Sequence, residues 1–137
     1  MSATEQNKRG AIRVVAAVIE KDGRYLITQR RPSAVLPLLW EFPGGKVEAE
    51  ESDSDALERE VRHRLGVTIK VLELMNSVTH TYENYSVALH LYTCQLTSGE
   101  LKALKVNDFR WVRSADFDDV SFTPADERSM SQLLGLN

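Results

Sequence analysis

Residues 45–67, with the sequence GKVEAEESDSDALEREVRHRLGV, are the stretch that decides the fold. Ser52 offers a side-chain oxygen to cap a helix, and Asp53 and Asp55 add acids near the positive end of the helix dipole. Apolar residues at helical spacing then lead to a glycine suited to a left-handed C-cap, namely Ala56, Leu57, Val61, Leu65 and Gly66. This stretch therefore predicts a helix that starts after Ser52 and stops at Gly66.

The same stretch carries a spaced set of polar and glycine positions. Its members are Gly45, Glu51, Arg59, Glu60, Val61, Gly66 and Val67. Their spacing resembles the signature of the Nudix superfamily, and segments 40–48, 111–112 and 123–126 resemble MutT-like and CTP-pyrophosphohydrolase-like members. The family pattern has a pair of glutamates where this chain has His63 and Arg64. The chain is thus similar to a family member with a degenerate Nudix box.

The remaining sequence predicts further strands and a second helix. Asp22-Gly23 between two apolar runs is typical of a hairpin turn, and the three prolines of 31–43 exclude a helix there. Strands are expected over 11–20, 24–30, 67–79, 85–96 and 108–113, and a second helix over 124–136. The family resemblance implies how these elements are arranged: an α/β fold, specifically an α/β/α sandwich with a mixed β-sheet.

Composition limits the classes of protein. A hydrophobic content of 42% in 137 residues suits one globular domain, expected over 11–137 behind a flexible tail over 1–10. The sequence predicts a cytoplasmic protein, because it has neither a signal-like segment nor an apolar run long enough to span a membrane. The net charge of −3 argues against binding of duplex nucleic acid, and Cys94, the single cysteine, is expected to be a buried thiol.

The altered box positions decide the expected chemistry. In an intact box, glutamates at i, i+3 and i+4 share one helix face and converge on divalent cations that bridge a diphosphate. Here Glu60 keeps the first position, His63 and Arg64 replace the others, and Lys105 stands where relatives often have a further glutamate. Glu60 is therefore the single retained ligand of that segment, and neither a metal ion nor another cofactor is expected. The cations could instead hold a diphosphate directly, since guanidinium groups pair with phosphate oxygens.

Further candidates follow from the resemblance. Arg64, His63 and Lys105, with Lys46 and Gly45 beside the box, form the expected phosphate-binding set. The nucleotide or its base is expected to contact Arg30, Phe42 and Asp126, although Phe42 also suits the core and Asp126 also suits a helix N-cap. Glu51 and Arg59 are expected to form a structural ion pair. His80 and Tyr82 could border the cleft and are more typical of packing than of catalysis.

Three functions stay open at this point. The first is a protein that binds a nucleotide or another diphosphate, with metal-dependent hydrolysis weak or lost. The second is an active Mg²⁺-dependent pyrophosphohydrolase of nucleoside di- or triphosphates, with Glu60 as a catalytic residue and Glu48, Glu50 or Glu51 supplying further carboxylates. The third is a non-catalytic recognition or regulatory module that resembles the Nudix-like domain of adenine DNA glycosylases.

Overall fold

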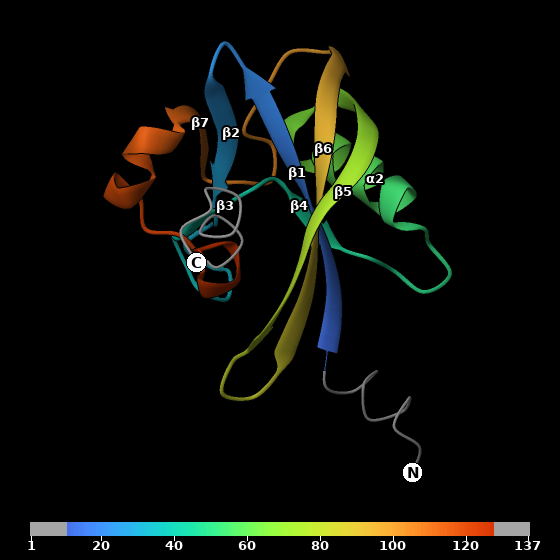
Figure 1. Ribbon diagram of the computed structural model, residues 1–137, viewed down its shortest axis with the longest axis vertical. Coiled ribbons are helices and arrows are strands. Elements are labelled where there is room, and N and C mark those ends of the chain that lie inside the picture. The colour runs from blue at the N-terminus through green and yellow to red at the C-terminus, as the bar shows by residue number, and fades with distance from the viewer. Residues whose placement is uncertain (1–10, 128–137) are drawn as a thin grey trace.

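The computed structural model describes residues 11–127, which form a mixed sheet with helical segments on both sides (Figure 1). The strands are β1 (Ala11–Lys21), β2 (Arg24–Gln29), β3 (Trp40–Glu41), β4 (Gly44–Lys46), β5 (Thr68–Thr81), β6 (Ser86–Ser98) and β7 (Asp108–Arg113). The helical segments are α2 (Asp53–Leu65), the 3₁₀ segment η1 (Ser114–Asp119) and a helical turn at 124–127. The predicted tail over 1–10 and the rest of the predicted second helix, 128–136, lie outside the described residues.

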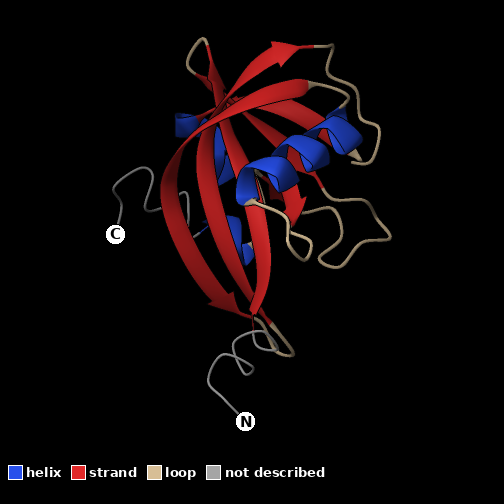
Figure 2. Cartoon of the chain, turned by 90° about the vertical axis from the view of Figure 1, so that its right-hand side faces the viewer, coloured by secondary structure: helices blue, strands red, loops and turns tan. Residues whose placement is uncertain are grey.

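The strand order confirms the predicted α/β/α sandwich with a mixed sheet. The main path is β3-β2-β1-β6-β5, while β4 also pairs with β1 and β7 with β2. Strands β1 and β6 run parallel, and the other strand pairs are antiparallel. In Figure 1, α2 lies on one side of the strands and η1 on the other, and Figure 2 shows α2 crossing the front of the sheet.

Both faces of the sheet are buried, so successive residues of β1 enter two different cores. Val15 and Ile19 pack toward α2, in a core that includes Leu57 and Leu65. The alternate residues Ala16 and Val18 pack on the opposite face, in a core with four buried aromatic side chains from the segments around η1 and β3. Each fully buried side chain of this size contributes roughly 1.5–3 kcal/mol. The two cores together fix α2 and the loops of the site to one rigid sheet.

Cys94 belongs to the core beneath α2. Its thiol is buried, and burial raises its pKa to about 12. The predicted core thiol is therefore confirmed.

The sheet opens between β1 and β2, and this opening admits the start of the box. Within the described strands, β1 and β2 pair at Glu20–Tyr25 and Lys21–Arg24, next to the hairpin turn, and diverge beyond it. Strand β4 then pairs with β1 over Val14–Ala16. A Cβ atom on Gly44 would overlap the carbonyl group of Val15, so this close approach of two backbones requires glycine.

Local sequence signals correctly predicted the hairpin turn and the ends of α2. Asp22 and Gly23 have φ values of 54° and 78°, as the predicted hairpin requires. Ser52 accepts a hydrogen bond from the backbone N–H of Asp55 at 3.1 Å, and Gly66 closes α2 with a φ of 72°. The predicted strands 67–79 and 85–96 extend further, to Thr81 and Ser98.

Two short strands and one 3₁₀ segment are absent from the sequence prediction. The expected loop over 31–43 contains β3, whose Trp40 pairs with Gln29 of β2 and donates its backbone N–H to Ser121 at 2.8 Å. Strands β3 and β4 form because their backbones pair with β2 and β1, which are distant in the sequence. Neither strand has the alternation of polar and apolar side chains from which a strand can be predicted. Within the described range, none of the helices combines the length and apolar character needed to cross a bilayer.

A polar cluster anchors the start of α2 to the sheet. The carboxylate of Asp53 accepts hydrogen bonds from Arg13 at 2.7 Å and from the hydroxyl group of Tyr92 at 2.5 Å, and lies 3.0 Å from Nδ1 of His90. Burial would raise the pKa of Asp53, but the hydrogen bonds from Tyr92 and His90 outweigh it and lower the pKa. The helix that carries the box is therefore fixed at its N-terminal end.

Candidate functional site

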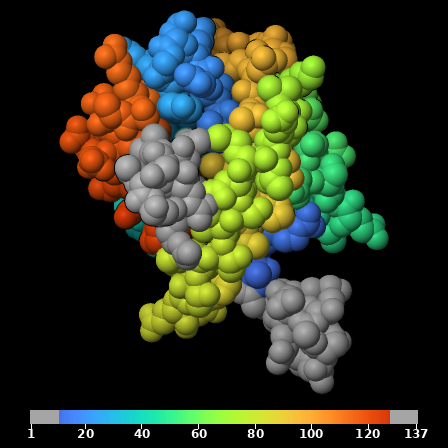
Figure 3. Space-filling model, in the orientation of Figure 1, coloured from blue at the N-terminus to red at the C-terminus, as the bar shows by residue number. Residues whose placement is uncertain are grey.

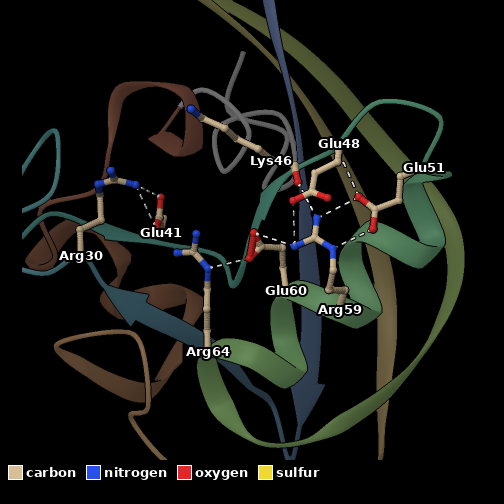
Figure 4. Close-up of polar contacts among 8 residues, drawn as sticks. All are labelled: Arg30, Glu41, Lys46, Glu48, Glu51, Arg59, Glu60 and Arg64. Atoms are coloured by element: carbon tan, nitrogen blue, oxygen red, sulfur yellow. Dashed lines mark hydrogen bonds and ion pairs between the residues drawn. The ribbon is translucent and has the colours of Figure 1, made fainter.

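Glu60 lies at the centre of the box, where α2 packs against β4. Its carboxylate sits against the backbone of Gly45, and a Cβ atom at that position would overlap the carboxylate carbon and one oxygen. The Nε atom of Arg64 donates to one carboxylate oxygen of Glu60 at 3.2 Å, and Nη1 of Arg59 lies 3.4 Å from the other (Figure 4). Two guanidinium groups therefore already hold both oxygens.

Arg59 and Glu51 form the ion pair that the family resemblance implies. Arg59 donates from Nε and Nη2 to the two carboxylate oxygens of Glu51, at 2.7 and 2.9 Å. Arg59 also donates to the carbonyl oxygen of Lys46 at 3.1 Å, and Glu51 accepts from the backbone N–H of Glu48 at 3.0 Å. The hydrogen bond from Arg59 lowers the pKa of Glu51 to about 2. These contacts hold the 46–52 loop to α2.

A small hollow of about 350 Å³ brings the altered box positions together. His63 and Arg64 project into it from α2, and Lys105 reaches it from the loop that precedes β7. The backbone N–H of Lys105 donates to the carbonyl oxygen of Arg64 at 3.1 Å, which fixes this loop to the end of the helix. Arg30, Arg31 and Glu60 complete its charged lining. Four formally cationic side chains and one histidine thus surround a single carboxylate.

The divalent cation that the box resemblance implies does not fit these residues. Among residues 11–127, no group of three or more His, Cys, Asp or Glu side chains is placed to hold a metal ion. Of the other box carboxylates, Glu51 is held by Arg59, and Glu48 is largely exposed with an oxygen 4.0 Å from Arg59. Glu60 is held by two guanidinium groups, and a cation close to a divalent ion opposes its binding.

A second, larger hollow of about 620 Å³ adjoins the cationic one, and Arg30, Glu60 and Arg64 line both. Arg30 donates from Nη1 to both carboxylate oxygens of Glu41 at 3.3 Å, and from Nε to the carbonyl oxygen of Val35 at 2.5 Å. Burial raises the pKa of Glu41, although Arg30 and Arg64 act in the opposite direction. The shared arginines therefore separate a charged compartment from a largely apolar one.

Asp126 contributes a second buried carboxyl group to the larger hollow. It accepts from the backbone N–H of Phe42 at 2.9 Å and from the hydroxyl group of Thr123 at 2.6 Å. Burial, and next the charge of Glu41, raise the pKa of Asp126 to about 7. The helix starts at Pro124, so Asp126 lies inside its first turn, and the interpretation of Asp126 as the N-cap is wrong.

The other predicted contact residues are divided between the core and the larger hollow. Phe42 is buried in the core beside Phe117 and Phe122, with ring centroids 6.4 and 6.3 Å away, and also lines the larger hollow. Gly45 and Lys46, predicted with the phosphate-binding set, line the larger hollow and are absent from the lining of the cationic one. In Figure 4 the Lys46 side chain points away from the Arg59–Glu51 pair.

Sequence reasoning missed three charged or aromatic residues that line the hollows, Glu41, Arg31 and Tyr85. Glu41 and Arg31 come from either end of the proline-rich segment and gave no periodic signal. Tyr85 was not considered, yet it lines the larger hollow together with Tyr82, whose place at the border of the cleft was one of the two expectations for it. The aromatic residues flanking the turn at 83–84 are the signal that could have indicated them.

Comparison with known proteins agrees with the fold and with the predicted family. The chain is 36% identical over 115 residues to the CTP pyrophosphohydrolase of Escherichia coli, covering 84% of this chain and 85% of the relative. It is 34% identical to the putative 8-oxo-dGTP diphosphatase 2 of Mycobacterium tuberculosis, covering 88% and 86%. The solution structure of the E. coli ORF135 protein superposes with a TM-score of 0.79 at 32% identity, covering 95% and 93%. The NUDIX domain model matches residues 14–132, and this chain belongs to the Nudix family.

Proposed function

We propose that this protein binds a nucleotide, or another small molecule containing a diphosphate, at a site that needs no metal ion, and that its metal-dependent hydrolysis is weak or lost. The observation that carries this proposal is the occupied carboxylate of Glu60. Arg59 and Arg64 already hold its two oxygens, while His63 and Lys105 stand beside it in the cationic hollow. A Nudix site of this charge favours an anion over a divalent cation.

The cationic hollow suits the phosphate groups. Guanidinium groups bind phosphate oxygens with paired N–H donors, and Arg30, Arg31 and Arg64 all line this hollow. Arg64 meets Glu60 through Nε, at 3.2 Å, so the Glu60 contact occupies a single donor of its guanidinium group. Lys105, which is exposed, adds an ammonium group to the lining of the same hollow. The phosphates therefore take the place that metal ions hold in an intact box.

The larger hollow suits the organic part of the ligand. It combines apolar side chains of β1 and β6 with two carboxyl groups, the partly buried Glu41 and the buried Asp126, that can accept hydrogen bonds from an amine. Because Arg30, Glu60 and Arg64 line both hollows, one extended molecule can occupy the two together. A nucleoside di- or triphosphate has this shape, and the relatives named above are pyrophosphohydrolases or diphosphatases of nucleotides.

The second candidate is an active Mg²⁺-dependent pyrophosphohydrolase. The names of the relatives and the retained Gly45, Glu51, Arg59 and Glu60 favour it. It requires carboxylates that converge on a cation, and the ion pairs of Glu51 and Glu60 with Arg59 and Arg64 oppose that arrangement.

The test is a calorimetric titration with nucleoside di- and triphosphates, in EDTA and in Mg²⁺, while release of phosphate and pyrophosphate is monitored. We expect binding in EDTA that weakens as salt is raised, with little or no turnover in Mg²⁺. Rapid turnover that depends on Mg²⁺ would establish the second candidate. Absence of binding under both conditions would refute both.

Two pairs of variants test the residues. Arg64→Ala removes a guanidinium from the shared wall, whereas Arg62→Ala removes an exposed one from the same helix that lines neither hollow. Loss of charge-assisted hydrogen bonds of about 1.5–3 kcal/mol predicts roughly 10- to 100-fold weaker binding for Arg64→Ala alone. Lys105→Ala and the exposed Lys70→Ala form a second pair. Equal effects within each pair would contradict the assignment of the cationic hollow.

A further inference from the structure

Two tyrosine rings lie at the turn between β5 and β6, next to the proposed ligand site. The backbone N–H of Tyr82 donates to the carbonyl oxygen of Tyr85 at 2.7 Å, which closes the turn. The rings of Tyr82 and Tyr85 stack with centroids 4.9 Å apart and an angle of 21° between their planes. The ring centroids of His80 and Tyr82 lie 4.6 Å apart, with an angle of 68° between the ring planes. Figure 3 shows this hairpin extending from the lower end of the molecule.

This pair is positioned as a wall of the larger hollow. Both tyrosines line the hollow beside Val87 and Leu89 of β6. The hydroxyl oxygen of Tyr82 accepts a hydrogen bond from the backbone N–H of Ala125 at 3.4 Å, so the ring lies next to the helical turn that carries Asp126. Both rings stay partly exposed. A flat aromatic surface therefore adjoins the turn of Asp126, in the same hollow as Glu41.

We propose that the Tyr82–Tyr85 pair is a stacking site for the planar ring of the ligand, and that it determines the preference for a nucleobase over other organic groups. This inference rests on the proposed function, because the phosphates of the same ligand would occupy the cationic hollow. Aromatic side chains stack on the faces of all bases, so the pair selects for a planar ring and leaves the choice of base to polar groups. Glu41 and Asp126 supply such groups in the same hollow.

The first experiment compares three probes by calorimetry in EDTA: inorganic tripolyphosphate, nucleoside triphosphates and free nucleosides. Tripolyphosphate tests the cationic hollow alone, and the nucleosides test the stacking site alone. We expect nucleoside triphosphates to bind about tenfold or more tightly than tripolyphosphate, which is the scale of one stacked base. Tyr82→Leu and Tyr85→Leu should each reduce this advantage severalfold and leave tripolyphosphate binding unchanged.

Conservative variants separate stacking from folding. Tyr82→Phe and Tyr85→Phe keep the ring, so they should retain the nucleoside advantage even though Tyr82→Phe removes the acceptor for Ala125. Thermal unfolding of each variant reports any loss of structure. If the leucine variants do not fold, nuclear Overhauser contacts between tyrosine ring protons and base protons in the unaltered protein decide the question.

The outcomes distinguish this inference from the proposed function. Tripolyphosphate and triphosphates that bind equally, or leucine variants without effect, would overturn the stacking site and leave metal-free phosphate binding intact. Nucleosides that contact the tyrosines in a protein that fails to bind tripolyphosphate would support the stacking site and refute the proposed function. Failure of all three probes would overturn both.

Discussion

Replacing His63, Arg64 and Lys105 together by glutamate should create a site for divalent cations. All three line the cationic hollow with Glu60, so the triple variant surrounds that carboxylate with three more. The formal charge of the hollow falls by five, one from the neutral histidine and two each from the arginine and the lysine. At an effective dielectric of about 20, a single cation about 4 Å from a divalent ion opposes its binding by roughly 8 kcal/mol, before solvent screening.

The same substitutions also free Glu60. Arg64 holds one of its oxygens at 3.2 Å in the unaltered protein, and that contact is lost in the variant. In EDTA the crowded carboxylates should repel one another and lower the thermal midpoint, and Mg²⁺ or Mn²⁺ should raise it again. The matched control replaces the same three residues by alanine, which removes the cations without adding ligands.

The assay is calorimetric titration with Mn²⁺ and Mg²⁺, together with thermal unfolding and Mg²⁺-dependent release of pyrophosphate. We expect the glutamate variant to bind the ions and the alanine variant to bind them far more weakly. If the glutamate variant folds but neither Mg²⁺ nor Mn²⁺ raises its thermal unfolding midpoint, then the loop at Lys105 and the α2 face do not form a common site. That result would refute the reasoning from charge.

Three further predictions concern stability. Gly45→Ala places a methyl group where the Glu60 carboxylate lies, and should destabilise the fold by about 1–3 kcal/mol in urea unfolding. The pKa of Asp126 is about 7 in the folded protein, against an ordinary value of 3.8. The contribution of Asp126 to the free energy of unfolding is therefore fully present below about pH 4 and is lost as the pH rises through 7. Asp126→Asn should therefore flatten the decline in urea midpoint between pH 5 and pH 8, and an unchanged decline would contradict this origin. Asp53→Asn weakens the cluster that includes Tyr92, and should lower stability at pH 7 by about 1–3 kcal/mol; an unaltered urea midpoint would exclude that anchoring role.

Local chemistry explains what the sequence could predict. The cap at Ser52, the C-cap at Gly66 and the turn at Asp22-Gly23 each depend on a few neighbouring residues, so their positions follow from short segments. The family resemblance also predicted that Lys105 would lie near Arg64, and the structure brings their backbones within hydrogen-bonding distance.

Distant contacts explain what could not be predicted. Strand β4 forms because the sheet opens between β1 and β2 and leaves room for Gly44 and Gly45. No alternation of polar and apolar side chains in the sequence predicts this strand. Glu41 interacts with Arg30 and with Asp126, which lies 85 positions later in the sequence, so its role depends on the fold. Tyr85 reaches the larger hollow because the β5–β6 hairpin places it there. Asp126 could be placed near the base by resemblance, while its bond to the backbone of Phe42 required the fold.

The retention of Gly45 and Glu60 is consistent with a metal-free site. Without Glu60, the guanidinium groups of Arg59 and Arg64 would lose the carboxylate between them, and like charges on neighbouring turns of α2 would stand unbalanced. Without glycine at position 45, the carboxylate would be displaced from beneath β4 and could not hold Arg64 at the junction of the two hollows. Under the proposed function, Gly45 and Glu60 would therefore serve as the counter-ion for the arginines of an anion site, so their presence alone does not indicate hydrolysis.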